Sequence, residues 1–167
     1  TSEIGFVFIS RRQQAGFAHQ LEHKKLEFVS MKKTKPCLLV GRNSPLYGLG
    51  SVDPSVLQTV KLVQTREDFY SISVHPGHLK EDISVRHSGQ TVVHTNSDSV
   101  VTSLLEHTDM GTVSCDLLAG RFERHNLRAI SLTDMKDSIH FGYIKRKRDE
   151  LSPAAAQFVD YLGKVLK

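Results

Sequence analysis

Leu151-Ser-Pro-Ala-Ala-Ala-Gln-Phe-Val-Asp-Tyr-Leu162 predicts a capped amphipathic helix near the end of this chain. Ser152 suits the N-cap, and Pro153 suits the first helical position because no partner is needed there for an N–H group. Two strand-like segments, residues 127–134 and 139–144, precede the helix, and a charged corner follows them. Apolar residues then recur at helical spacing and predict a single apolar stripe: Phe158, Val159, Leu162, Val165 and Leu166.

The composition is ordinary for a globular protein. The chain has 167 residues, 39% of them hydrophobic and 24% charged, which allows one core or two small lobes. No apolar run approaches the roughly 20 residues that span a bilayer, and no signal peptide opens the sequence, so we expect no membrane contact. Cys37 and Cys115 are too few for a disulfide scaffold, which favours a reducing cytoplasm.

The charge is mildly basic, with a formal net charge of +4. The densest basic run is residues 145–148, Lys-Arg-Lys-Arg. No aromatic residues interleave with it, as they do in many nucleic-acid grooves. We therefore interpret this run as a solvated strand end.

Alternating segments predict a parallel α/β architecture. Residues 4–9 predict a buried parallel strand, because continuous apolar runs are typical of strands covered on both faces. A domain rarely begins on such a strand, so we expect a further N-terminal portion before Thr1. Further strands are predicted at 26–30, 37–40, 61–65, 91–95 and 111–115, a polar connection at 32–35, and helices at 54–60 (after an N-cap at Asp53), 100–107 and 117–124.

Four segments carry a family resemblance. They are Glu3-Ile-Gly-Phe-Val-Phe8, the crossover at residues 26–46, the strand–polar loop–helix–glycine segment at 95–113, and Leu151-Ser-Pro-Ala-Ala-Ala156. In order and spacing they resemble the effector-binding domain of LysR-type transcriptional regulators. The chain departs from that family at Cys115-Asp116, where a proline is usual.

The resemblance implies an α/β, two-lobed fold of the type 2 periplasmic-binding-protein kind, with the N-terminal part of lobe I missing. Residues 1–40 and 144–167 would form lobe I, residues 41–143 would form lobe II, and strands near residues 37–42 and 141–145 would cross the hinge. It also implies self-association as a dimer or tetramer, for which helix 97–108 and its adjoining strand are our candidate interface. Operator DNA would be bound only by a helix-turn-helix domain that is absent from this chain.

In that fold the ligand lies between the lobes, beyond the carboxyl ends of parallel strands. Those ends predict eight ligand-binding residues: Ile9, Ser10, Thr65, Arg66, Asn96, Ser97, Asp98 and Cys115. The strongest physical case is the helix start at residues 96–98, since unpaired N–H groups and the helix dipole suit a carboxylate. Family members often sense anionic metabolites, so we expect an anionic effector.

Simpler roles stay open for several of these residues. Asn96 and Ser97 can serve only as helix caps, and Asp98 can compensate the helix dipole and repel an anion. Arg66 can pair with a ligand carboxylate or be a solvated strand end. Without an identifiable base, Cys115 fits a buried small hydrophobe better than a reactive thiol.

No metal, cofactor or catalytic set is expected. His19 and His23 have the i, i+4 spacing that can bind zinc, but Gln20 stands where a His-Glu-x-x-His motif needs Glu. His75-Pro-Gly-His78 lacks partner ligands. We therefore predict a regulatory sensor and no enzyme. The alternatives are a solute-binding or transport protein of the same fold and, less favoured, an enzyme on that fold. A helix-turn-helix encoded upstream would favour the regulator, and a signal peptide the transport protein.

Overall fold

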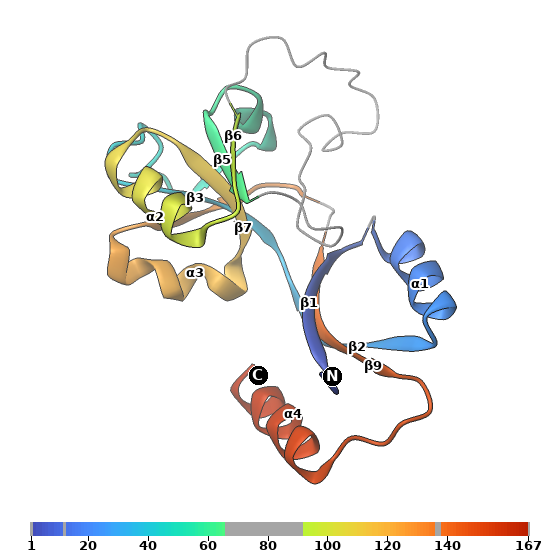
Figure 1. Cartoon of the computed structure of the whole chain (residues 1–167). Coiled ribbons are helices and arrows are strands. Elements are labelled where there is room, and N and C mark those ends of the chain that lie inside the picture. Colours follow the sequence, from blue (N-terminus) through green and yellow to red (C-terminus); the bar gives the residue numbers. More distant parts are fainter. Residues whose placement is uncertain (1, 12, 66–91, 136–137, 167) are drawn as a thin grey trace. The chain divides into compact units, whose positions relative to one another are not determined.

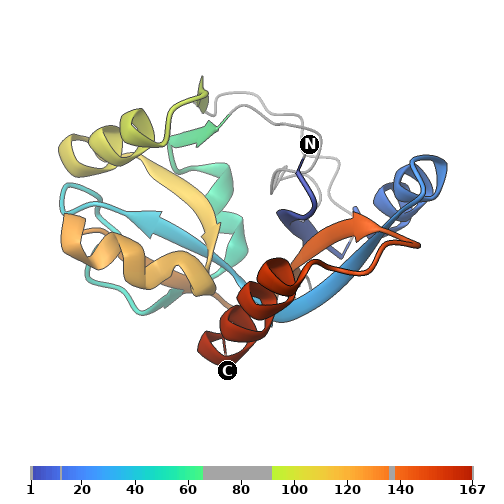
Figure 2. The same cartoon turned by 60° about the horizontal axis from the view of Figure 1, so that its bottom comes forward.

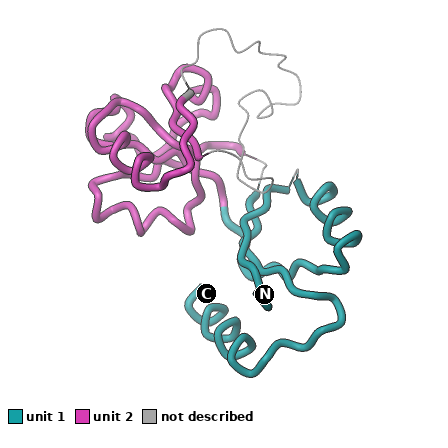
Figure 3. Tube along the Cα trace, viewed as in Figure 1, with its two compact units in different colours: residues 1–34, 138–167 teal, residues 35–137 magenta. Residues whose placement is uncertain are grey.

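The computed structural model describes residues 2–11, 13–65, 92–135 and 138–166, and the chain divides into two compact units (Figure 3). Unit 1 comprises Thr1–Thr34 and Ser138–Lys167, and unit 2 comprises Lys35–Asp137. The chain therefore passes between units at residues 34–35 and 137–138. The predicted hinge segments 37–42 and 141–145 each lie wholly within one unit, and the predicted lobe boundaries at 40 and 143 lie further along the chain.

Unit 1 is a three-stranded antiparallel sheet, in the order β1-β9-β2, with two helices (Figure 1). Its elements are β1 (Gly5–Ser10), α1 (Gln14–His23), β2 (Leu26–Thr34), β9 (Ile139–Arg146) and α4 (Pro153–Val165).

The two helices of unit 1 contact opposite faces of its sheet. Phe17 of α1 meets Phe28 edge-on, with 5.8 Å between ring centroids, and Phe158 of α4 meets Phe6 at 5.7 Å. Gly5 and Phe28 both lie opposite Ile144, so these three residues share one face of the sheet. Phe6 follows Gly5 and therefore points to the other face. Figure 2 brings α4 to the front of this unit. Aromatic contacts on both faces thus hold the small sheet between its helices.

The direction predicted for the first strand is wrong. β1 pairs antiparallel with β9, from Gly5 opposite Ile144 to Ser10 opposite Ile139, and Phe6 is 36% exposed. An apolar run indicates that both faces have apolar neighbours, but it does not encode the direction of the partner strand.

The predicted polar connection at residues 32–35 is also mostly strand. β2 continues through Lys32 and Lys33 to Thr34, after a register shift between Ser30 and Lys32. A bulge of this kind lets polar residues continue in a strand at the edge of a sheet.

The predicted cap of the last helix is confirmed. Ser152 Oγ accepts a hydrogen bond from the Ala155 N–H at 3.3 Å, and Pro153 is the first helical residue. Ser152 Oγ also donates to the Glu3 carboxylate at 2.7 Å, and the Ser152 N–H donates to the other carboxylate oxygen. These two bonds lower the pKa of Glu3. Glu3 therefore fastens the start of α4 to the segment that precedes β1.

The single apolar stripe predicted on this helix is only partly correct. Val159, Leu162 and Leu166 are half-buried, whereas Phe158 and Val165 are 50% and 62% exposed. Helical spacing identifies the apolar residues but does not show how wide a stripe the sheet can cover.

Unit 2 is a six-stranded mixed sheet in the order β4-β8-β3-β7-β5-β6. β5 runs parallel to β6 and β7, whereas β3 is antiparallel to β7 and β8, so the predicted parallel architecture is confirmed only in part. Its elements are β3 (Pro36–Val40), β4 (Ser51–Val52), the 3-10 helix η1 (Pro54–Gln58), β5 (Leu62–Thr65), β6 (Val92–Thr95), α2 (Asp98–His107), β7 (Gly111–Cys115), α3 (Asp116–Phe122), the 3-10 helix η3 (Glu123–His125) and β8 (Arg128–Leu132).

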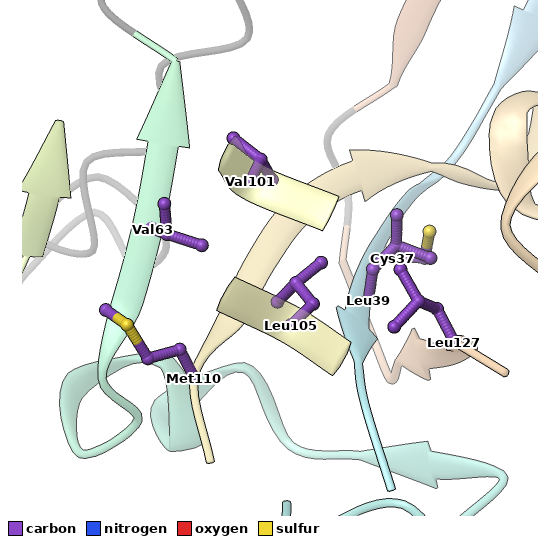
Figure 4. Close-up of a cluster of buried hydrophobic side chains, with 7 residues drawn as sticks. All are labelled: Cys37, Leu39, Val63, Val101, Leu105, Met110 and Leu127. Atoms are coloured by element: carbon purple, nitrogen blue, oxygen red, sulfur yellow. The ribbon is translucent and has the colours of Figure 1, made fainter. Parts of the chain in front are cut away.

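Two hydrophobic clusters cover the faces of the unit 2 sheet. Alternate residues of β3 supply both, since Leu39 packs in one and Leu38 in the other. Val101 and Leu105 of α2 belong to the first cluster (Figure 4). Leu39 and Leu105 are fully buried, so α2 is fixed on the sheet by its central turns. Among the described residues, no helix is both long and apolar enough to cross a bilayer.

Candidate ligand-binding site

Two parallel strands end side by side at one edge of the unit 2 sheet. β5 and β6 pair in parallel, and Thr65 lies opposite Thr95. The chain then continues from β6 through Asn96 and Ser97 into α2 (Figure 1). The predicted residues Thr65, Asn96, Ser97 and Asp98 therefore share this edge.

Ser97 is the N-cap residue of α2. This residue is extended, with φ −125° and ψ 117°, and its Oγ accepts from the Val100 N–H at 3.4 Å. The Val101 N–H donates to the Ser97 carbonyl at 3.1 Å. Within the described part of the chain, the N–H groups of Asp98 and Ser99 have no hydrogen-bond acceptor. Two free donors at the positive end of a ten-residue helix are suited to an anion.

Two polar side chains lie near these donors, the amide of Asn96 and the carboxylate of Asp98. Asn96 is exposed, and its side chain makes no hydrogen bond to the described residues. Asp98 is exposed in the first turn of α2, where a carboxylate is stabilised by the helix dipole and opposes a second negative charge. The geometry therefore places two amide donors beside one carboxylate, that of Asp98.

Thr95 was not predicted as a site residue, although it lies at the same edge. Its Oγ1 accepts from the Ser97 N–H at 3.2 Å, which fixes the turn between β6 and α2. The sequence could have indicated Thr95 as a site residue, because it ends the strand predicted at residues 91–95.

The other four predicted ligand residues are Ile9, Ser10, Arg66 and Cys115. Ile9 and Ser10 belong to unit 1, where Ile9 is 1% exposed and the Ser10 N–H donates to Gln13 Oε1 at 3.0 Å. Arg66 lies outside the described residues. Cys115 is fully buried at the carboxyl end of β7, which runs parallel to β5 from Gly111 opposite Leu62. Four of the eight predicted residues lie at the ends of β5 and β6, and the ligand role of all eight stays a prediction.

The two cysteines are buried thiols with no disulfide between them. Burial, together with the nearby Cys115 and Asp116, raises the pKa of the Cys37 thiol to about 12. A thiol with such a pKa is protonated near neutral pH and is a poor nucleophile.

The histidine pair on α1 is a surface feature. His19 and His23 are exposed, and their rings meet edge-on with centroids 4.7 Å apart. Within the ranges that the structure describes, no cluster of three metal-ligating side chains occurs. His75 and His78 lie outside those ranges.

The basic run at residues 145–148 forms ion pairs within unit 1. Its carboxylate partners are Glu27 for Lys145 at 2.7 Å, Asp149 for Arg146 at 3.3 Å and Glu22 for Lys147 at 2.8 Å. The bond to Glu27 raises the pKa of Lys145, and the bond from Lys147 lowers the pKa of Glu22. These contacts give the run a structural role at the end of β9.

Comparison with protein families matches residues 9–167 to the LysR substrate binding domain. A search of curated proteins found no match. Among solved structures, the chain is similar to the effector binding domain of QuiR in complex with shikimate (16% identity, TM-score 0.64, covering 85% of this chain and 66% of that chain). It is also similar to CbnR, a LysR family transcriptional regulator (14% identity, TM-score 0.68, covering 99% of this chain and 53% of that chain). A third similar structure is HinK, a LysR family transcriptional regulator from Pseudomonas aeruginosa (14% identity, TM-score 0.65, covering 85% of this chain and 48% of that chain).

At these identities the solved structures establish the fold, which confirms the predicted α/β class. The chain spans between 48% and 66% of the length of these three chains. The family match, in contrast, extends over nearly the whole sequence. The chain belongs to the LysR substrate binding domain family.

Proposed function

We propose that this chain is the sensing domain of a LysR-type bacterial regulator, and that it binds a small anionic metabolite in the cytoplasm. The observation that carries the proposal is the start of α2, where two amide donors without an acceptor among the described residues stand at the carboxyl ends of β5 and β6. QuiR, which has a similar fold, was solved with shikimate, a small carboxylate. Ligand binding would shift the equilibrium of an attached DNA-binding domain.

The attached domain is also part of the proposal. Full-length CbnR was solved in complex with its target DNA, and the chain spans 52% of that protein. We propose that this chain contacts operator DNA only through such a domain. A transport protein or an enzyme of the same fold is the alternative, and the similarity to transcriptional regulators favours the sensor.

The test is a thermal-shift screen of small carboxylates, with shikimate as the first probe. A ligand that binds only the folded state and is present at 100 times its dissociation constant stabilises that state by about 2.7 kcal/mol. A selective rise in melting temperature with one carboxylate, absent with its neutral amide, supports the proposal. Equal responses to the acid and the amide contradict an anion site.

Ser97→Ala is the first variant to test at this site. We expect it to lower the affinity for the carboxylate about tenfold or more, since a hydrogen bond to a charged group contributes roughly 1.5–3 kcal/mol. It also removes the cap on the Val100 N–H, so a fall in stability of about 0.5–2 kcal/mol is expected. Calorimetric titration and denaturant unfolding measure the two effects separately.

Ser99→Ala is the matched control, because Ser99 is exposed in the same turn and its hydroxyl makes no hydrogen bond to a described residue, while alanine keeps the backbone N–H. We expect it to change neither quantity measurably. Lowered stability with unchanged affinity in Ser97→Ala would make Ser97 a helix cap alone.

We also propose that the edge formed by β6 and α2 mediates self-association. Val93 on β6 is 37% exposed and Val100 on α2 is 44% exposed, and β6 is the outermost described strand of its sheet. Exposed apolar side chains on an edge strand favour pairing with a second copy.

Val100→Lys is expected to raise the dimer dissociation constant about tenfold or more, because a two-fold interface loses the valine twice and gains two like charges. Sedimentation of the full-length protein measures this. Val165→Lys, at a 62% exposed valine on α4 in unit 1, should leave the dimer intact. A strict monomer at high concentration before any substitution contradicts the proposal.

A further inference from the structure

Two arginines at one end of unit 2 carry charges that no described carboxylate neutralises. Arg42 lies just beyond β3, and Arg128 opens β8 directly opposite Val40. Both side chains are exposed. Within the described residues, neither guanidinium has a carboxylate at ion-pairing distance. This contrasts with the basic run of unit 1, where carboxylates pair with three of the cations.

Neutral groups hold both arginines in place. Arg42 Nη2 donates to Asn126 Oδ1 at 2.7 Å. Arg128 Nη1 donates to the Tyr47 carbonyl at 3.3 Å, and its Cζ lies 5.6 Å from the centre of the Tyr47 ring. These partners restrict the side chains without reducing their charge, so less conformational entropy is lost when an anion binds.

The backbone brings the two arginines to the same end of the sheet. Asn126 has φ 55°, a left-handed conformation that asparagine tolerates better than most residues, and it ends η3 two positions before Arg128. Because Arg42 contacts Asn126 and Arg128 lies opposite Val40, the two arginine residues share one end of the β3–β8 ladder. The nearby Glu106 carboxylate is engaged by His125 Nδ1 at 3.0 Å.

We propose that Arg42 and Arg128 form a binding site for a phosphate group, separate from the start of α2. Guanidinium groups donate in a planar fork that matches the oxygens of phosphate, and a doubly charged oxyanion can accept from two forks at once. Apart from the bonds to Asn126 and Tyr47, the guanidinium N–H groups make no hydrogen bond to the described residues, and the site uses these groups.

A purely structural role for Arg42 makes a different prediction. Asn43 Nδ2 donates to the Glu106 carbonyl at 3.5 Å, so Arg42 lies near the negative end of α2. If Arg42 only stabilised that helix end, its loss would lower stability and leave phosphate binding unchanged.

The test is titration of inorganic phosphate into the full chain, followed through the arginine Nε–H resonances, with chloride at equal ionic strength as the reference. We expect saturable shifts in the wild type. Asn126→Asp keeps the shape of the side chain but gives Arg42 a carboxylate partner, and Arg128→Gln removes the second guanidinium. Each should weaken phosphate binding about tenfold or more. Arg146→Gln, at an arginine already paired with Asp149, is the control and should leave binding unchanged.

A sugar phosphate titrated in parallel distinguishes a phosphate ester from the free ion, and saturable binding of either supports the site. Equal shifts with chloride overturn the proposal. Unchanged phosphate affinity in both Asn126→Asp and Arg128→Gln, with denaturant unfolding showing folded protein, also overturns it.

Discussion

Gly41→Ala is expected to destabilise unit 2 by about 3 kcal/mol, the upper range for overpacking. A Cβ on Gly41 would lie 1.7 Å from the Leu105 carbonyl oxygen and 2.7 Å from its carbonyl carbon. Both atoms belong to the backbone of α2, which cannot rotate away as the end of a side chain can. Because Leu105 is fully buried in the core below α2, either the end of β3 or the helix must move. Urea unfolding followed by circular dichroism measures the loss.

Gly48→Ala is the control in the same connection, since a Cβ there meets no atom within 4 Å. We expect a change within about 0.5 kcal/mol. Gly41→Ala should also weaken binding of an anionic ligand, because the displaced helix carries the proposed site at its other end. An unfolding midpoint equal to that of the wild type would contradict the close approach of β3 and α2.

Local signals in the sequence predicted the helix starts well. Ser152 before Pro153 and Asp53 before Pro54 are both N-caps in the structure, although the second opens a short 3-10 helix. Ser97, which the sequence left open between cap and ligand contact, is the N-cap of α2. Capping depends on neighbouring residues, so a single sequence carries that information.

Long-range features could not be predicted in the same way. The antiparallel pairing of β1 depends on β9, more than a hundred positions away, and the apolar run of β1 fits either direction. α1 was not predicted as an element, because only Phe17 and Leu21 of its residues are buried and Gly16 interrupts the helical pattern.

In the candidate sites, too, local features could be predicted from the sequence and long-range features could not. The free amides at the start of α2 follow from a local pattern of strand, polar loop and helix. The placement of Thr65 beside Thr95 requires the register of two strands far apart in the sequence. The contact of Arg42 with Asn126 spans 84 positions, and no sequence motif marks either residue.

Gly142→Ala is expected to destabilise unit 1, also by about 3 kcal/mol. Gly142 lies in β9, the central strand of the sheet, and an added Cβ would lie 2.2 Å from the Val29 carbonyl oxygen and 2.6 Å from the ring of Phe28. The carbonyl is part of the β2 backbone, and the ring is packed against Phe17 of α1. Relief of the clash must therefore shift β2 or expel an aromatic side chain that joins sheet and helix.

Gly5→Ala is the matched control, because a Cβ there would lie 3.8 Å from the Ile144 side chain, an ordinary contact. Alanine in place of a strand glycine should be neutral or stabilise by about 0.5–1 kcal/mol. Amide hydrogen exchange distinguishes the units: Gly142→Ala should reduce protection in β2 and β9 while β3 and β7 keep theirs. Equal loss of protection in β3 and β7 would show that both units unfold together. That outcome would contradict the expectation that the two units, which meet in the chain at residues 34–35 and 137–138, unfold independently.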